Sequence, residues 1–339
     1  METRKLQEVG GGTFTVSIPK GWARDHGLEG GMDLRLYTHH DGSLLVRSSD
    51  ADGGCLDEVA IDVDADGPDA VRWAIRTAHA AGFETITIRS AEPFTDAERK
   101  AAQSTVRGLV GTDITAESDA AITVSHMLDA SSVSVRQSVV QLQYVAIGLQ
   151  RDAIDAFLDA ADAHARVRDR ADEARRSAEM ITRHLSRSLV SHAELDALDV
   201  SRPELFVYYV TAECLETVVG RAVRIAALTE RLPGPVPGPL ASDLRSAAEG
   251  AELALDDAVT AIFDGDTTTA RRSKERCADA VERIDEVERA LFDGTAVESV
   301  PTAVALAGAI EQLRRMAACG RRVADAAARS TVRARNLDL

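Results

Sequence analysis

The second half of the chain repeats its own pattern. Residues 152–165 align with residues 257–270 at an offset of 105 positions, and the segment that begins at Pro203 aligns with the segment that begins at Pro301 at an offset of 98. Two separate segments recur in the same order, so the order of the helices is duplicated. This duplication restricts the region to a tandem helical architecture.

Apolar spacing places these repeats in a helix bundle. Ser201 and Glu204 form a capping box that starts one helix. Beyond it, buried-type positions recur every three and four residues, which is typical of a bundle seam. These positions are Tyr208, Thr211, Leu215, Val218, Ala222 and Ile225. The Pro/Gly-rich stretch 232–239 is expected to be a stiff joint, so the two repeats are residues 131–232 and 239–333.

In residues 1–50 apolar side chains alternate with a period of two, as in strands, rather than with the helical spacing of the repeats. Alternation predicts strands at 3–9 and 13–18 with a turn at Gly10–Gly12, followed by a proline and a short helix. A second hairpin is expected around Asp41-Gly42. Four strands and one helical turn give a small core and leave strand edges open. We therefore expect this segment to form an intertwined homodimer.

Residues 56–128 have the pattern of a small α/β domain. Strands are predicted at 58–63, 84–90 and 120–128, and helices at 67–81 and 95–110. Thr95 and Glu98 form a capping box at the start of the second helix. No Gly-rich phosphate loop follows either of the first two strands, so a nucleotide site is not expected. The domain is interpreted as a spacer or a sensor.

Charge and composition narrow the classes of function. The chain of 339 residues has 55 Asp and Glu against 39 Lys and Arg, a formal net charge of −16, and four lysines. Short carboxylates stay hydrated where salt screens charge, so this composition is typical of salt-loving archaea.

The four cysteines share no metal or disulfide spacing and are expected to be small core residues. No apolar run approaches the roughly 18 residues of a membrane span. An apolar signal core is also missing, so we expect a cytoplasmic protein without membrane insertion.

The sequence does not predict an enzyme. The histidines are scattered without metal spacing, and no nucleophile elbow or triad signature is present. The aspartate-rich stretches are interpreted as solvated faces. We expect no catalytic residue and no cofactor.

The N-terminal segment resembles a known DNA-binding family. The strand into Ile18-Pro19, the short helix, the Gly-Leu-Glu-Gly-Gly stretch and the closing hairpin resemble the AbrB/SpoVT swapped-hairpin domain. The resemblance implies that basic residues beside the hairpin reach DNA phosphates and groove edges. The expected DNA-binding residues are Arg4, Lys5, Thr13, Lys20 and Arg24, with Thr13 at the family's arginine position. Residues 1–50 hold six Lys and Arg against seven Asp and Glu, so ordinary surface charge on a domain that only dimerises is the alternative.

The duplicated three-helix units resemble the PhoU family of phosphate-homeostasis regulators. Phe157-Leu158, Arg183 and Leu215-Glu216 lie where that family has its Ala-Phe, Arg-x-Leu and LERIGDHA motifs. The family commonly binds metal through a Glu and an Asp four residues apart in each repeat, since a hard cation needs several oxygen ligands. The corresponding positions here are Glu216, Gly220, Arg314 and Ala318. Three of the four lack a carboxylate, so no metal is expected.

The whole chain resembles the archaeal PhoU-type transcriptional regulators of haloarchaea. The expected fold class is multidomain α+β: a swapped-hairpin β domain, a small α/β middle domain and an all-α region of tandem three-helix bundles. The expected function is a homodimeric, DNA-binding transcriptional regulator of phosphate homeostasis and uptake, whose bundle receives a signal from phosphate-transport or signalling components. The alternative is an interaction protein that regulates a phosphate transporter without binding DNA. Seven arginines between Arg314 and Arg335 are interpreted as a solvated face paired with acidic helices of the other repeat, with a second anionic contact, to DNA or a partner, as the alternative.

Overall fold

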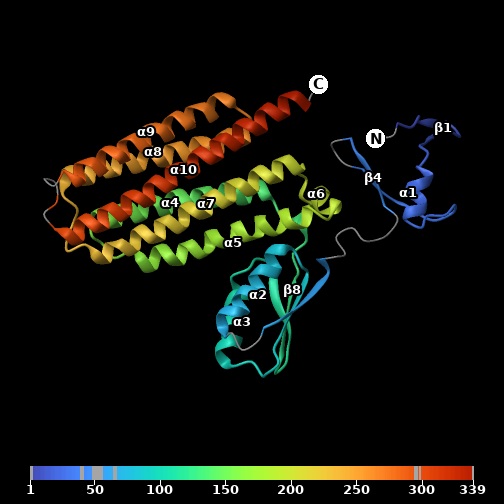
Figure 1. Ribbon diagram of the computed structural model, residues 1–339, viewed down its shortest axis with the longest axis horizontal. Helices are drawn as coiled ribbons and strands as arrows, with labels where there is room; N and C mark the ends of the chain where they lie inside the picture. Colours follow the sequence, from blue (N-terminus) through green and yellow to red (C-terminus); the bar gives the residue numbers. More distant parts are fainter. Residues whose placement is uncertain are drawn as a thin grey trace. The chain divides into compact units, whose positions relative to one another are not determined.

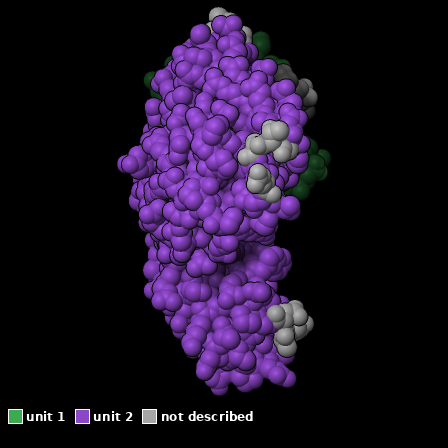
Figure 2. Space-filling view, turned by 90° about the vertical axis from the view of Figure 1, so that its left-hand side faces the viewer, with its two compact units in different colours: residues 1–55 green, residues 56–339 purple. Residues whose placement is uncertain are grey.

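The chain forms two compact units, residues 1–55 and 56–339 (Figure 2). The computed structural model describes residues 3–38, 42–47, 56–63, 67–293, 297 and 299–337. His39, His40, Asp41 and Cys55, which the sequence analysis considered, lie outside the described residues.

The N-terminal unit consists of two hairpins and one short helix. Its elements are β1 (Gln7–Val9), β2 (Thr13–Thr15), α1 (Lys20–Asp25), β3 (Arg35–Thr38) and β4 (Leu44–Arg47). Among the described residues, β1 pairs only with β2 and β3 only with β4, both antiparallel. Gly10 and Gly11 adopt φ of 66° and 72°, which a tight turn requires and which glycine adopts without strain. The strands are shorter than the alternation predicts, because the alternation continues beyond the paired residues.

The second unit begins with a four-stranded sheet covered by two helices (Figure 1). The elements are β5 (Glu58–Asp62), α2 (Pro68–Ala81), β6 (Thr85–Arg89), α3 (Asp96–Arg107), β7 (Thr112–Glu117) and β8 (Ala121–His126). The strand order is β5-β6-β8-β7, with β5 parallel to β6 and β8 antiparallel to both of its neighbours. The capping box of Thr95 and Glu98 is present at the start of α3. Strand β7 was not predicted, because its sequence TDITAE is polar and none of its side chains is buried.

The rest of the unit is a bundle of long helices. They are α4 (Val135–Leu158), α5 (His164–Ser188), α7 (Arg202–Leu228), α8 (Gly238–Asp264), α9 (Thr267–Phe292) and α10 (Val300–Leu337), with the short α6 (His192–Leu198) between α5 and α7. Helices α4, α5 and α7 pack on one another, as do α8, α9 and α10. The two groups join through α4 against α8 and α7 against α10 (Figure 1).

The repeat seen in the sequence corresponds to these two groups of three helices. The offsets of 105 and 98 residues differ by seven, which is the length of α6. Helix α6 is therefore an insertion in the first repeat, placed after the second of its three long helices. The capping box of Ser201 and Glu204 starts α7, as the sequence predicts.

Small and medium apolar side chains fill the bundle core. All six positions of the predicted α7 seam are buried, as are Cys214, Cys277 and Cys319, which are free thiols. The Pro-rich joint is held on the first repeat, because the buried Val236 donates its backbone N–H to the carbonyl oxygen of Leu158 at 2.9 Å. No helix in the described ranges combines the length and the apolar character that a membrane crossing requires.

Candidate functional site

The predicted DNA-binding residues all lie on the exposed surface of the N-terminal unit. Arg4 and Lys5 precede β1, Thr13 begins β2, Lys20 begins α1 and Arg24 is in its last turn. Because Val9 pairs with Thr13, the register places Thr13 beside the turn of the first hairpin. Arg4 and Lys5 lie beyond the opposite, open end of that hairpin. The register of the first hairpin therefore places Thr13 at one end of it and Arg4 and Lys5 at the other.

The same unit exposes most of its large apolar side chains. None of its described residues is buried. The exposed large apolar side chains are Leu6, Val9, Phe14, Val16, Ile18, Met32, Leu36 and Leu44. Phe14 and Leu36 keep 65% and 62% of their surface exposed. This much exposed apolar surface on so small a unit is typical of an interaction surface.

In the second repeat, Arg314 lies among carboxylates. It occupies the position at which the PhoU family commonly has a metal-binding carboxylate. Arg314 Nη2 donates to Asp285 Oδ1 at 2.9 Å and to Glu288 Oε2 at 2.8 Å, and Nη1 donates to Glu311 Oε2 at 3.3 Å. The guanidinium thus neutralises the carboxylates that would otherwise attract a metal ion. Asp285 and Glu288 are on α9 of the same repeat, so the expectation that Arg314 pairs with the other repeat is wrong. The reason is that α9 packs directly on α10.

In the first repeat, arginines also accompany the remaining carboxylates. Glu216 lies 3.8 Å from Arg175 Nε, and Glu179 pairs with Arg76. Burial raises the pKa of both carboxyl groups. Gly220 and Ala318 are exposed and supply no ligand. These positions do not fit a divalent ion, and no group of three or more His, Cys, Asp or Glu in the described part of the chain has metal-binding geometry.

A buried polar cluster fixes the α/β part of this unit to the bundle. Arg183 on α5 is 1% exposed, and its Nη1 donates to the carbonyl oxygens of His79 at 3.1 Å and Phe83 at 2.8 Å. Arg187, one turn later, donates to the carbonyl oxygen of Gly82 at 2.9 Å. These contacts place two cations at the C-terminus of α2, where the helix dipole is negative. A Cβ on Gly82 would come within 2.6 Å of Arg187 Cγ, so the approach requires glycine.

Three histidines that the sequence leaves scattered lie within this cluster. His79 and His126 stack edge to face with ring centroids 5.8 Å apart. Burial, followed by the nearby Arg183 charge, lowers the pKa of His79 to about 3 and of His126 to about 4. His184 Nδ1 lies 2.6 Å from Glu194 Oε1, and Arg187 Nε donates to Glu194 Oε2 at 2.9 Å.

Comparison with solved structures finds a similarity to a phosphate regulatory protein. A match to the crystal structure of the phosphate transport system regulatory protein PhoU from Streptococcus pneumoniae has a TM-score of 0.41 and 14% sequence identity. It covers 58% of this chain and 96% of that one. No family model matches the chain, and no curated protein matches it.

The structure assigns Arg183 a role that its motif did not reveal. The sequence identified this residue only through its position in a family motif, whereas the structure shows a buried contact between two parts of the chain. The partner carbonyls of His79 and Phe83 are about 100 residues away in sequence. Because arginine is almost never fully buried without such partners, the burial of Arg183 in the structure is what reveals this role.

Proposed function

We propose that this chain is a non-catalytic regulator of phosphate homeostasis that works as two associated copies. The observation that carries the two-copy part of the proposal is the exposed apolar surface of the N-terminal unit, which a second copy would cover. The motif resemblance at Phe157-Leu158, Arg183 and Leu215-Glu216 supports the link to phosphate. In this proposal the helical repeats bind a phosphate-transport or signalling protein.

An exposed apolar pair on the bundle supports output through protein contact. Val140 and Tyr144 lie one turn apart on α4, and 45% and 77% of their surfaces are exposed. Residues four apart share one helix face, so the two side chains form a continuous apolar spot. Exposed tyrosines with apolar neighbours are common anchors at protein interfaces.

DNA binding by the N-terminal unit is the second candidate for the output. Lys20 and Arg24 favour it, because both lie on α1, are exposed and form no ion pair with the residues that the structure describes. Phosphate contacts lose about 0.9 log units of affinity per contact for each log unit of salt. Specific binding at molar salt therefore requires close hydrogen bonding rather than charge alone.

In either case the mechanism is a shift between populations of the dimer. A partner that binds one arrangement of the repeats more tightly favours that arrangement. The same difference in binding energy then changes the affinity at the other site, which is the definition of allosteric coupling. This mechanism requires no chemical step on the bound partner.

One experiment separates the two outputs. The tagged full-length chain is cross-linked in cells grown with high and low phosphate, and both its bound proteins and its bound DNA are identified. Phosphate-dependent capture of a transport or signalling component without discrete DNA sites supports the protein-contact output. Discrete DNA sites that disappear in the Lys20→Ala/Arg24→Ala variant, and persist in Arg329→Ala/Arg333→Ala, support the DNA output instead. Neither kind of partner in either condition would contradict the proposed function.

A further inference from the structure

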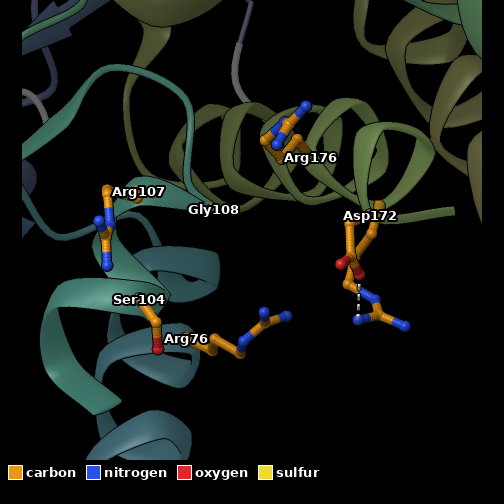
Figure 3. A pocket seen from close by; sticks show the side chains of 7 residues that line it. Arg76, Ser104, Arg107, Gly108, Asp172 and Arg176 are labelled. Carbon is orange, nitrogen blue, oxygen red and sulfur yellow. Dashed lines mark hydrogen bonds and ion pairs between the residues drawn. The ribbon is translucent and has the colours of Figure 1, made fainter. Parts of the chain in front are cut away.

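A pocket of ≈ 230 Å³ lies between α2, the end of α3 and α5 (Figure 3). Its lining residues are Arg76, Ser104, Arg107, Gly108, Asp172, Arg175 and Arg176. Figure 3 shows Arg76, Ser104 and Arg107 on α2 and α3 at one side of the pocket and Asp172 and Arg176 on α5 at the other. The pocket therefore joins the α/β part to the first helical repeat.

The charge of this pocket is opposite to that of the chain. Four of its seven lining residues are arginines and one is a carboxylate, in a protein with a net charge of −16. Arg107 and Arg176 form no ion pair with any described residue. Arg175 pairs with Asp172 at 3.3 Å, and Arg76 pairs with Glu179 on its α5 side. A guanidinium has five N–H donors. Arg76, with one carboxylate partner, and Arg175, which also lies 3.8 Å from Glu216, therefore both keep donors available.

We propose that this guanidinium pocket binds a small phosphate-class anion, either orthophosphate or pyrophosphate. Arginine presents planar, paired N–H donors that match phosphate oxygens in two-point contacts. Arginines that line one pocket repel one another, and an anion bound there offsets part of that repulsion. The pocket is smaller than the roughly 300–1,000 Å³ of sites for drug-sized ligands, which favours an inorganic anion over a nucleotide.

The position of the pocket gives the anion a structural effect. Helices α2 and α3 supply three lining side chains and α5 supplies the other three, besides the backbone of Gly108. An anion held by both groups adds to the contacts that Arg183 and Arg187 make nearby. Binding stabilises the docked arrangement by mass action. The inference that an anion binds here rests on the geometry of the pocket alone. The inference that the bound anion acts as a signal rests on the proposed function.

Calorimetric titration of the full-length protein tests the site. Orthophosphate, pyrophosphate and sulfate are titrated separately at one fixed concentration of potassium chloride. The test variant is Arg107→Gln/Arg176→Gln, which removes two lining charges that are not tied in ion pairs. The control variant is Arg89→Gln/Arg166→Gln, which removes one exposed arginine from the α/β part and one from α5 outside the pocket.

We expect orthophosphate or pyrophosphate to bind the wild type and the control alike, and to bind the test variant at least tenfold more weakly. Equal binding by the test variant, or no binding of either anion to the wild type, would overturn the proposal. Sulfate binding as tight as that of phosphate would overturn the assignment to the phosphate class. A failed titration would leave partner capture and dimerisation unaffected, so it would not count against the proposed function.

Discussion

At the scale of single residues, the buried histidines set a pH dependence. His79 is 1% exposed, and its folded pKa of about 3 lies below the ordinary value of 6.5. The unfolded chain therefore binds a proton below pH 6.5 that the folded chain does not bind. The free energy of unfolding falls as pH drops through this window, since stability rises with pH wherever the unfolded state binds more protons.

This reasoning predicts the behaviour of His79→Gln. A single such group changes the free energy of unfolding by about 1.4 kcal/mol per pH unit. Between pH 6 and pH 4, denaturant titrations should show a slope that is smaller in His79→Gln than in the wild type by about this amount. A slope that His79→Gln does not reduce would mean that this imidazole is charged in the folded state.

Arg314 is a second residue whose charge determines local chemistry. We expect the wild-type protein to hold no stoichiometric, chelator-resistant divalent metal, because Arg314 neutralises Asp285, Glu288 and Glu311. Arg314→Glu should gain measurable binding of a divalent cation, because four carboxylates then converge and hard cations prefer several oxygen ligands.

Elemental analysis and calorimetry check this prediction. Arg321→Glu is the matched control, because it changes an exposed charge two turns along α10 and leaves Arg314 and its three carboxylate partners in place. A tightly held metal in the wild type, or equal metal binding by the two variants, would refute the neutralising role of Arg314.

At the scale of elements, the two N-terminal hairpins carry the prediction about self-association. Phe14→Asp and Leu36→Asp each replace an exposed apolar side chain that a second copy is expected to cover. Burial of such a side chain contributes about 2 kcal/mol. In a symmetric dimer each change counts twice, so the dissociation constant should rise by roughly 100- to 1,000-fold.

Light scattering over a dilution series measures this constant. Phe292→Asp is the control, because Phe292 is also 69% exposed but belongs to α9. An unchanged dissociation constant in Phe14→Asp and Leu36→Asp would place the contact between copies elsewhere in the chain.

Elements that depend on residues close together in the sequence could be predicted. The capping boxes at Thr95 and Ser201 start helices, and the α7 seam is buried at every predicted position. Strand β7 escaped prediction because an exposed edge strand needs no apolar alternation. Helix α6 was not predicted as a separate element, because an alignment of the two repeats shows an insertion only as a change of offset.

The candidate sites were less predictable because their contacts are distant in sequence. Arg183 meets carbonyls from α2, and the guanidinium pocket joins residues from α2, α3 and α5. No spacing rule connects such positions. The replacement of family carboxylates at Gly220, Arg314 and Ala318 was visible in the sequence, but the side chains that surround Arg314 were not.

At the scale of the whole molecule, we propose that the N-terminal unit joins two copies of a chain whose other unit folds independently. Residues 56–339 contain every described buried apolar residue, in the sheet core and in the bundle core. Removal of the N-terminal unit should therefore leave the remainder folded. It should also remove the surface that the eight exposed apolar side chains present.

Sedimentation equilibrium of the full chain and of residues 56–339 tests this claim most directly, with circular dichroism of the shorter chain as a check on folding. We expect the full chain to sediment as a dimer and the folded shorter chain to sediment as a monomer at the same concentration and salt. A folded shorter chain that remains as dimeric as the full chain, or a full chain that is monomeric at high concentration, would contradict the account.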